Sequence, residues 1–168
     1  MIKKARRAYQ RARRPLSLSY DDINLGHLPD LIGYALRRTQ LAVFRDFSRA
    51  FSRYNIRPVQ YGVLTVIELN PGLKQQDVCL ALGIRRANFV ALLNDLEGRG
   101  LAERGASAND QRANALYLTE KGKALMRELR KVNKAHEDRV AAGLSRAKRS
   151  LLIQMLSKIK FAADNSDG

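Results

Sequence analysis

The chain has 168 residues, a length that fits a single domain with a core of its own. It carries 31 Lys and Arg against 16 Asp and Glu, a formal net charge of +15, which points to a polyanionic partner, either nucleic acid or an anionic membrane surface. No apolar run approaches the roughly 18 residues that span a bilayer, so no membrane-spanning segment is predicted. The single cysteine excludes an intrachain disulfide framework, and we expect a soluble, cytoplasmic protein.

Residues 1–20 are expected to form a basic N-terminal tail. Its first 14 residues contain seven Lys or Arg and no acid. Such a segment is a solvated tail, an arm that follows DNA phosphates or a groove, or an organellar transit peptide.

Four helices are predicted between the tail and the middle of the chain. The first runs from about residue 28 to 54, because its apolar residues recur three and four positions apart on one face. The next three cover about 58–69, 74–82 and 85–99. The last of these ends at Gly100, a residue that is free to adopt the left-handed cap conformation.

A β-hairpin is predicted after the fourth helix. Residues 101–104 and 114–118 alternate as strands do, and a polar loop carrying Asp110 and Arg112 joins them. Thr119 then starts a long helix to about Gly143.

The C-terminal part is predicted to be helical. Ser145 is a suitable N-cap for a last helix, which carries an apolar seam made of Leu151, Leu152, Met155, Leu156 and Ile159. Together these elements predict a mainly α protein with a small β-hairpin.

The segment 82–122 follows the order of a helix-turn-helix with a hairpin wing, which places one helix in a DNA major groove and a loop beside it. It contains the pattern Leu96-Glu97-x-x-Gly100-Leu101, Arg104, Asp110-x-Arg112 and Leu118-Thr119-x-x-Gly122. This pattern resembles the MarR family of winged-helix transcription regulators, and the resemblance extends more loosely over 28–159. It implies a winged helix-turn-helix homodimer with interlocked N- and C-terminal helices, no cofactor, and no enzymatic activity.

The expected organisation has four parts. After the tail come an N-terminal dimerisation helix in 21–57, a winged helix-turn-helix DNA-binding domain in 58–119, and C-terminal dimerisation helices in 120–168. The helices at both ends of the chain carry long apolar seams, and a single winged module is too small to cover both of them. This favours a dimer. The alternative is a monomer whose terminal helices pack on each other.

The N-terminal end of the fourth helix is the predicted site of base recognition in double-stranded DNA. Arg grips guanine and Asn grips adenine bidentately, so the expected contacts are Arg85, Arg86, Asn88 and Asn94. The alternative for the two arginines is contact with phosphate alone. The neighbouring Ala87, Val90 and Ala91 depart from the family's usual polar and basic residues, which leaves the operator sequence open.

Further DNA contacts are expected around this helix. Arg112, tied to Asp110 by a charge-assisted hydrogen bond, is predicted at the wing tip beside a minor groove; the alternative is a structural turn pair. Arg104 at the base of the hairpin, with Gln75 and Gln76 at the start of the third helix, is expected to contact phosphate.

An effector site is expected between the first, second and long helices. The resemblance implies an anionic aromatic ligand, and the start of the first helix is similar to regulators of hydroxycinnamate and benzoate-type catabolism, some of which respond to coenzyme A thioesters. Aromatic faces and guanidinium groups suit such a ligand. The expected residues are Tyr34, Arg37, Arg38, Phe44, Arg45, Tyr61 and His136. The alternative assigns the aromatic residues to the dimer core and the arginines to salt bridges.

No catalytic or metal-binding pattern is found. The chain has two histidines far apart, so His136 is assigned to the inner seam of the long helix rather than to zinc. Cys79 is either a small buried hydrophobe or a redox sensor. The sequence therefore predicts a dimeric repressor released by an aromatic acid or its thioester; the alternative is an effector-independent, architectural DNA-binding protein.

Overall fold

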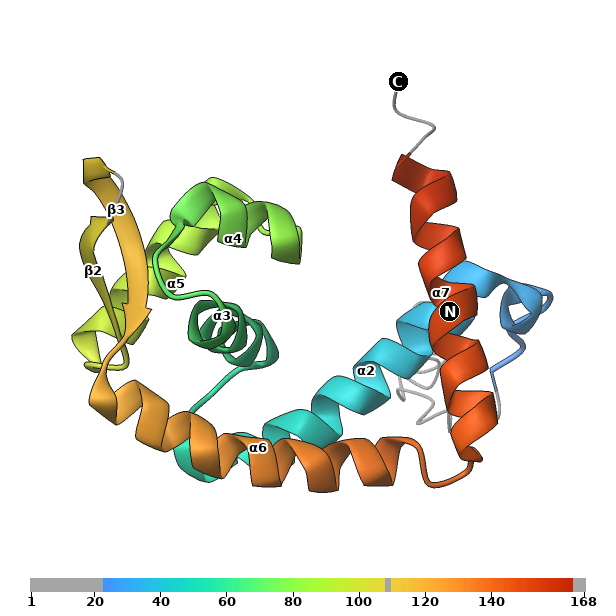
Figure 1. Cartoon of the computed structure of the whole chain (residues 1–168). Coiled ribbons are helices and arrows are strands. Elements are labelled where there is room, and N and C mark those ends of the chain that lie inside the picture. The colour runs from blue at the N-terminus through green and yellow to red at the C-terminus, as the bar shows by residue number, and fades with distance from the viewer. Residues whose placement is uncertain (1–22, 108–109, 165–168) are drawn as a thin grey trace, which may run out of the picture. The chain divides into compact units, whose positions relative to one another are not determined.

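The computed structural model describes residues 23–107 and 110–164, with the side chains of 106–114 and 160–164 left out (Figure 1). The basic tail predicted over residues 1–20 lies outside this part. The chain divides into two compact units, 1–40 and 41–168.

The first unit contains a short 3-10 turn, η2 (Leu28–Asp30), and the beginning of helix α2 (Ile32–Phe51), which continues into the second unit. The sequence predicted one helix over 28–54. The structure instead ends the helix with a second 3-10 turn, η3 (Ser52–Tyr54), because Asn55 adopts the left-handed conformation at φ +50°.

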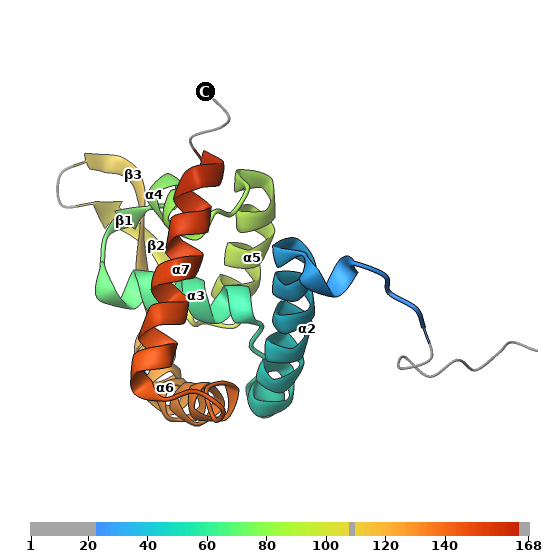
Figure 2. The same cartoon turned by 90° about the vertical axis from the view of Figure 1, so that its right-hand side faces the viewer.

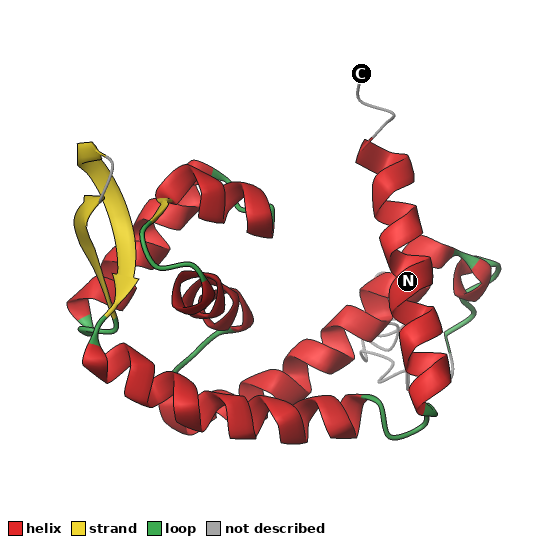
Figure 3. Ribbon diagram, in the orientation of Figure 1, coloured by secondary structure: helices red, strands yellow, loops and turns green. Residues whose placement is uncertain are grey.

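The second unit contains the remaining helices and a small sheet, drawn in yellow in Figure 3. The helices and strands are α3 (Pro58–Leu69), β1 (Leu73–Lys74), α4 (Gln75–Leu82), α5 (Arg86–Gly98), β2 (Ala102–Ser107), β3 (Asp110–Leu118), α6 (Glu120–Val140) and α7 (Arg146–Asp164). The predicted helices are confirmed with small shifts at their ends.

The sheet has three antiparallel strands in the order β1-β3-β2 (Figure 2). Strand β1 was not predicted, since two residues are too few to show an alternating pattern. It pairs with β3 through Leu73 and Leu116, and β2 pairs with β3 through Glu103 and Tyr117. Strand β1 therefore ties the start of α4 to the wing.

The core of the second unit lies around α3, which runs between the α4–α5 pair and α6 (Figure 1). Phe51, Phe89 and Leu64 are fully buried there. The predicted core face of α5 is confirmed, with Phe89, Leu92, Leu93 and Leu96 all buried. Each such side chain contributes about 1.5–3 kcal/mol by leaving water.

The Leu118-Thr119-x-x-Gly122 pattern has a direct structural cause. The Thr119 hydroxyl accepts a hydrogen bond from the Gly122 N–H at 3.0 Å and donates one to the Gly100 carbonyl at 2.6 Å. A side chain at Gly122 would place its Cβ 2.0 Å from the Leu101 carbonyl oxygen. The glycine therefore allows α6 to start directly against the first residue after the α5 turn.

The last helix, α7, keeps its apolar side chains in solvent. The predicted N-cap is confirmed, because the Lys148 N–H donates to the Ser145 hydroxyl at 3.3 Å. All residues of α7 from 151 to 159 are exposed, including Leu152 and Leu156. Within the described residues, no helix is long and apolar enough to cross a membrane.

Candidate DNA interface

The N-terminal end of α5 presents its polar residues to solvent. Arg85 is the N-cap residue with extended backbone angles, and α5 begins at Arg86. The side chains of Arg85, Arg86 and Asn88 are exposed, as predicted, while Phe89 points into the core. Two guanidinium groups and an amide therefore stand together at the positive end of the helix dipole, a combination suited to DNA.

A surface groove of about 600 Å³ borders this helix end. Its lining includes Arg57 from the start of α3 as well as Arg85 and Asn88. Sequence reasoning missed Arg57, although its position directly before Pro58 marks it as an exposed residue at a helix start. Basic side chains from the starts of α3 and α5 therefore line the same groove.

A polar network fixes the orientation of α5 against α3. The side chain of Gln60 is buried, with the residue 1% exposed. Its side-chain oxygen accepts from the Arg57 backbone N–H at 2.9 Å, and its side-chain nitrogen donates to the Asp95 carboxylate at 2.6 Å. Arg99 donates to the carbonyls of Asn55 and Tyr54 at 2.9 and 3.0 Å. These bonds hold the recognition surface in place before DNA binds.

Arg104 and Asn94, both predicted to contact DNA, contact each other. The Arg104 guanidinium donates to the Asn94 side-chain oxygen at 3.0 Å and forms an ion pair with Glu97 at 2.6 Å. Arg104 thus joins strand β2 to the exposed side of α5. Contact of either residue with DNA remains a prediction.

The predicted position of the wing loop was wrong. Asp110 and Arg112 were assigned to a polar loop, but β3 already begins at Asp110, which pairs with Ser107. Polar residues in a solvated hairpin still pair through their backbone, so the alternating apolar pattern ends before the strand does. Their side chains lie outside the described part, and so does the predicted bond between them.

The two glutamines predicted to contact phosphate lie in the first turn of α4. Gln75 is half-buried and Gln76 is exposed. Their location at a helix N-terminus agrees with the predicted position, and the contact with phosphate remains a prediction.

The predicted effector residues in the second unit fall into two groups. Phe44 and Arg45 are exposed on α2. Tyr61 and His136 lie around Phe47, whose ring centroid is 6.1 Å from the Tyr61 ring and 5.4 Å from the His136 ring. Burial raises the pKa of Tyr61 above its ordinary value.

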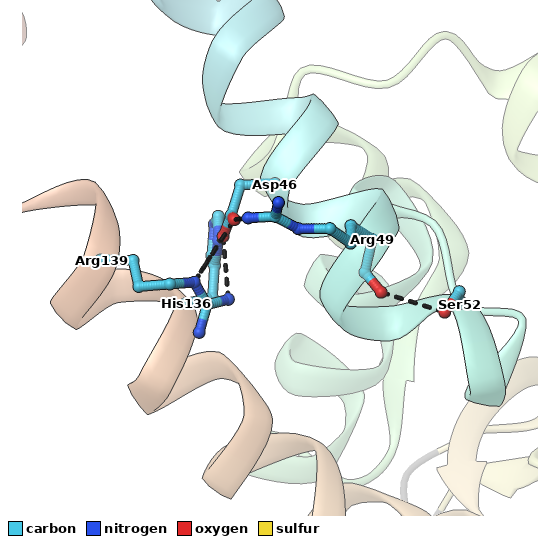
Figure 4. A network of polar contacts seen from close by, with 5 residues as sticks. All are labelled: Asp46, Arg49, Ser52, His136 and Arg139. Atoms are coloured by element: carbon cyan, nitrogen blue, oxygen red, sulfur yellow. Dashed lines mark hydrogen bonds and ion pairs between the residues drawn. The ribbon is translucent and has the colours of Figure 1, made fainter.

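His136 is part of a charged network that connects α2 to α6 (Figure 4). Its Nδ1 lies 2.8 Å from a carboxylate oxygen of Asp46, and Arg139 donates to the same carboxylate at 2.9 Å. Arg49 also forms an ion pair with this carboxylate. The bonds from Arg139 and His136 hold the pKa of Asp46 well below its usual range. The assignment of His136 to the inner seam is confirmed, since its side chain is 3% exposed.

The other predicted effector residues belong to the first unit. Tyr34 is half-buried on α2, and Arg37 and Arg38 are exposed. The structure therefore brings Tyr61 and His136 together, while a ligand contact of any of the seven residues remains a prediction.

Cys79 is buried, and burial raises the pKa of its thiol, which favours the small hydrophobe over the redox sensor. Among the described residues, no group of three or more His, Cys, Asp or Glu side chains is arranged to hold a metal ion.

An exposed helix with arginines at its N-terminal end, supported by a second helix and flanked by a β-hairpin, defines a winged helix-turn-helix DNA-binding protein. Comparison with known proteins gives a more specific result. A family model described as MarR family matches residues 54–113. The chain is also 31% identical over 147 residues to a candidate transcriptional regulatory protein for the hcr operon of Thauera aromatica, covering 87% of this chain and 89% of that protein. It therefore belongs to the MarR family.

Two solved structures of the transcriptional repressor CouR are similar over 82% of this chain. The one bound to a 23-mer DNA duplex is 42% identical, with a TM-score of 0.77 over 98% of its chain. The one bound to p-coumaroyl-CoA is 41% identical, with a TM-score of 0.75 over 97% of its chain.

Proposed function

We propose that this protein is a homodimeric, cytoplasmic transcriptional repressor that binds a palindromic operator and is released by an aromatic acyl-coenzyme A thioester of the hydroxycinnamoyl type. The observation that carries the proposal is the exposed cluster of Arg85, Arg86 and Asn88 at the start of α5, in a chain 42% identical to a repressor with a DNA-bound structure.

In the DNA complex, these three side chains contact base edges in the major groove. Arg57, which lines the same groove as Arg85 and Asn88, neutralises a phosphate beside them. Gln75, Gln76, Arg104 and Arg112 hold the backbone on either side. Because a two-fold dimer presents two such helices, the operator is a palindrome whose half-sites lie about one helical turn apart.

The proposed effector has two chemical parts, an aromatic acyl group and coenzyme A, and each part has its own candidate residues. The acyl ring packs against aromatic side chains, for which Tyr34, Phe44 and Tyr61 are the candidates. His136, the remaining candidate, packs edge-on against Phe47 and is bonded to Asp46. The phosphates of the coenzyme A part pair with Arg37, Arg38 and Arg45. The thioester is favoured over the free acid because CouR, 41% identical to this chain, has been solved with p-coumaroyl-CoA.

The test is release from an operator duplex selected by the protein from a random pool. Titration with p-coumaroyl-CoA should lower operator affinity, whereas free p-coumarate and coenzyme A should have little effect. A hundredfold release corresponds to about 2.7 kcal/mol of preference for the form that does not bind DNA. Arg45→Gln should need about ten times more thioester, and Lys148→Gln should behave as wild type.

Two outcomes would contradict the proposal. If neither thioester nor acid changes operator affinity at millimolar concentration, the effector assignment is wrong. If the selected duplex binds no better than random DNA, the protein is the effector-independent architectural alternative, because a regulator prefers its site by about a thousandfold or more.

A further inference from the structure

Helix α5 carries an apolar side chain in water, one turn after the arginines at its start. Val90 is 40% exposed, whereas Phe89 and Leu93 on the core face of the same helix are fully buried. Valine forms helices less well than alanine or leucine, because its branched side chain restricts χ1. The stability of the helix therefore does not explain why this exposed position holds a valine.

Asn94 lies one turn further along the same side of α5. Residues four apart on a helix are neighbours, with Cβ atoms about 5–6 Å apart, so the side chains of Val90 and Asn94 are adjacent. Both residues are exposed. An apolar group and an amide therefore face solvent next to each other on the helix that carries the proposed base contacts.

Arg104 fixes the way in which the Asn94 amide is turned. The Arg104 guanidinium lies 3.0 Å from the Asn94 side chain and is itself held by Glu97 at 2.6 Å. Because a guanidinium group donates hydrogen bonds and has no acceptor, the atom that faces it is the Asn94 side-chain oxygen. The side-chain nitrogen of Asn94 is then left as the donor for DNA.

This orientation changes the base that Asn94 is expected to recognise. The bidentate contact with adenine uses the oxygen and the nitrogen of the amide together, and here Arg104 engages the oxygen. A single donor needs an acceptor in the major groove, which is guanine O6 or N7, adenine N7 or thymine O4. Among these bases, only thymine places a methyl group beside its acceptor, and this methyl group matches the apolar surface of Val90.

We infer that Val90 and Asn94 together recognise one thymine in each half-site of the operator. The C5 methyl group packs against Val90, and O4 accepts a hydrogen bond from the Asn94 side-chain nitrogen. Arg104 is a positioning residue, because it keeps the amide nitrogen available to the base. The inference rests on the proposed function, since it requires α5 to lie in the major groove.

The methyl contact is tested with the operator duplex selected from a random pool, in which single thymines are replaced by deoxyuridine. Replacement at one position in each half-site should weaken binding about tenfold, because two buried methyl contacts are lost. Val90→Ala should bind the thymine and uracil duplexes about equally. Val140→Ala, the same substitution at the exposed C-terminal end of α6, should keep the wild-type difference.

A second duplex tests the amide. 5-Methylcytosine, paired with guanine at the same position, keeps the methyl group but presents an N4 amino donor in place of O4. The wild-type protein should prefer thymine over 5-methylcytosine by about tenfold or more. Asn94→Asp should reverse this preference, because a carboxylate accepts from the amino group and cannot donate to O4.

Three results would each overturn the inference. They are a selected operator in which no thymine differs from uracil, a Val90→Ala variant that discriminates as wild type does, and an Asn94→Asp variant that still prefers thymine. In all three cases the operator is still bound, so the proposed function stands. If no duplex is selected over random DNA, the proposed function itself is wrong, and this inference fails with it.

Discussion

At the scale of single residues, the Asp46 carboxylate is the group on which the contact between α2 and α6 is centred. It accepts from His136, Arg139 and Arg49, one on its own helix and two on α6. The sequence predicted that His136 faces inward, but it gave no sign of its partner. Asp46 is 90 positions away, and nothing in the local pattern around either residue pairs them.

The depressed pKa of Asp46 leads to a prediction about pH. The pKa of the Asp46 carboxyl is lower in the folded state than in the unfolded chain. Such a group stabilises the fold at pH values above its pKa in the unfolded chain, and this contribution is lost as the pH falls toward its pKa in the folded state. Asp46→Asn should therefore lower the melting temperature at pH 7. The difference from wild type should shrink as the pH falls below about 4, the ordinary pKa of Asp.

Thermal unfolding followed by circular dichroism between pH 3 and pH 7 measures this effect. Asp138→Asn is the control, because its carboxylate forms only an exposed pair with Lys134, and such pairs contribute little. A melting-temperature difference for Asp46→Asn that is independent of pH would show that the network does not act through charge.

At the scale of helices and strands, prediction worked where a local rule applied. Pro58 fixed the start of α3, and Gly100 ended α5 with φ +65°. It failed where long-range pairing decides the structure. Strand β1 exists because Leu73 pairs with Leu116, and Gln60 is buried because Asp95, 35 positions away, accepts its amide. Arg57 was missed as a candidate site residue because only the fold places it beside Arg85.

The junction between the wing and α6 gives a second prediction. Gly122→Ala should destabilise the protein by about 1–3 kcal/mol or more, because its Cβ would meet the Leu101 carbonyl at 2.0 Å and the backbone has to move. Gly98→Ala is the matched control in α5. It meets nothing within 4 Å, and alanine is the better helix former, so it should be neutral or slightly stabilising.

Urea unfolding of both variants measures the difference. The expected order of midpoints is Gly98→Ala at or above wild type and Gly122→Ala well below. Equal midpoints for Gly122→Ala and wild type would mean that α6 is able to start at another distance from the wing.

At the scale of the whole molecule, α7 connects the fold to the proposed dimer. Its large apolar residues from Leu151 to Ile159 are 38–56% exposed, among them Leu152, Leu156 and Ile159. Apolar surface of this extent on one helix marks an interface, because a soluble chain rarely leaves such a contiguous patch in water. Burying it against a second copy also sets the distance between the two recognition helices, on which palindrome binding depends.

The last prediction separates this role from the stability of the protomer. Leu152→Glu combined with Leu156→Glu places two carboxylates on the apolar seam, and burying them without partners is unfavourable. The double variant should sediment as a monomer at micromolar concentration while keeping its helical circular dichroism. Its operator affinity should fall by more than tenfold, because each protomer then binds a single half-site. Ser150→Glu, which adds one carboxylate at an exposed polar position of the same helix, should remain dimeric. A double variant that stays dimeric and binds the operator as wild type does would remove α7 from the interface.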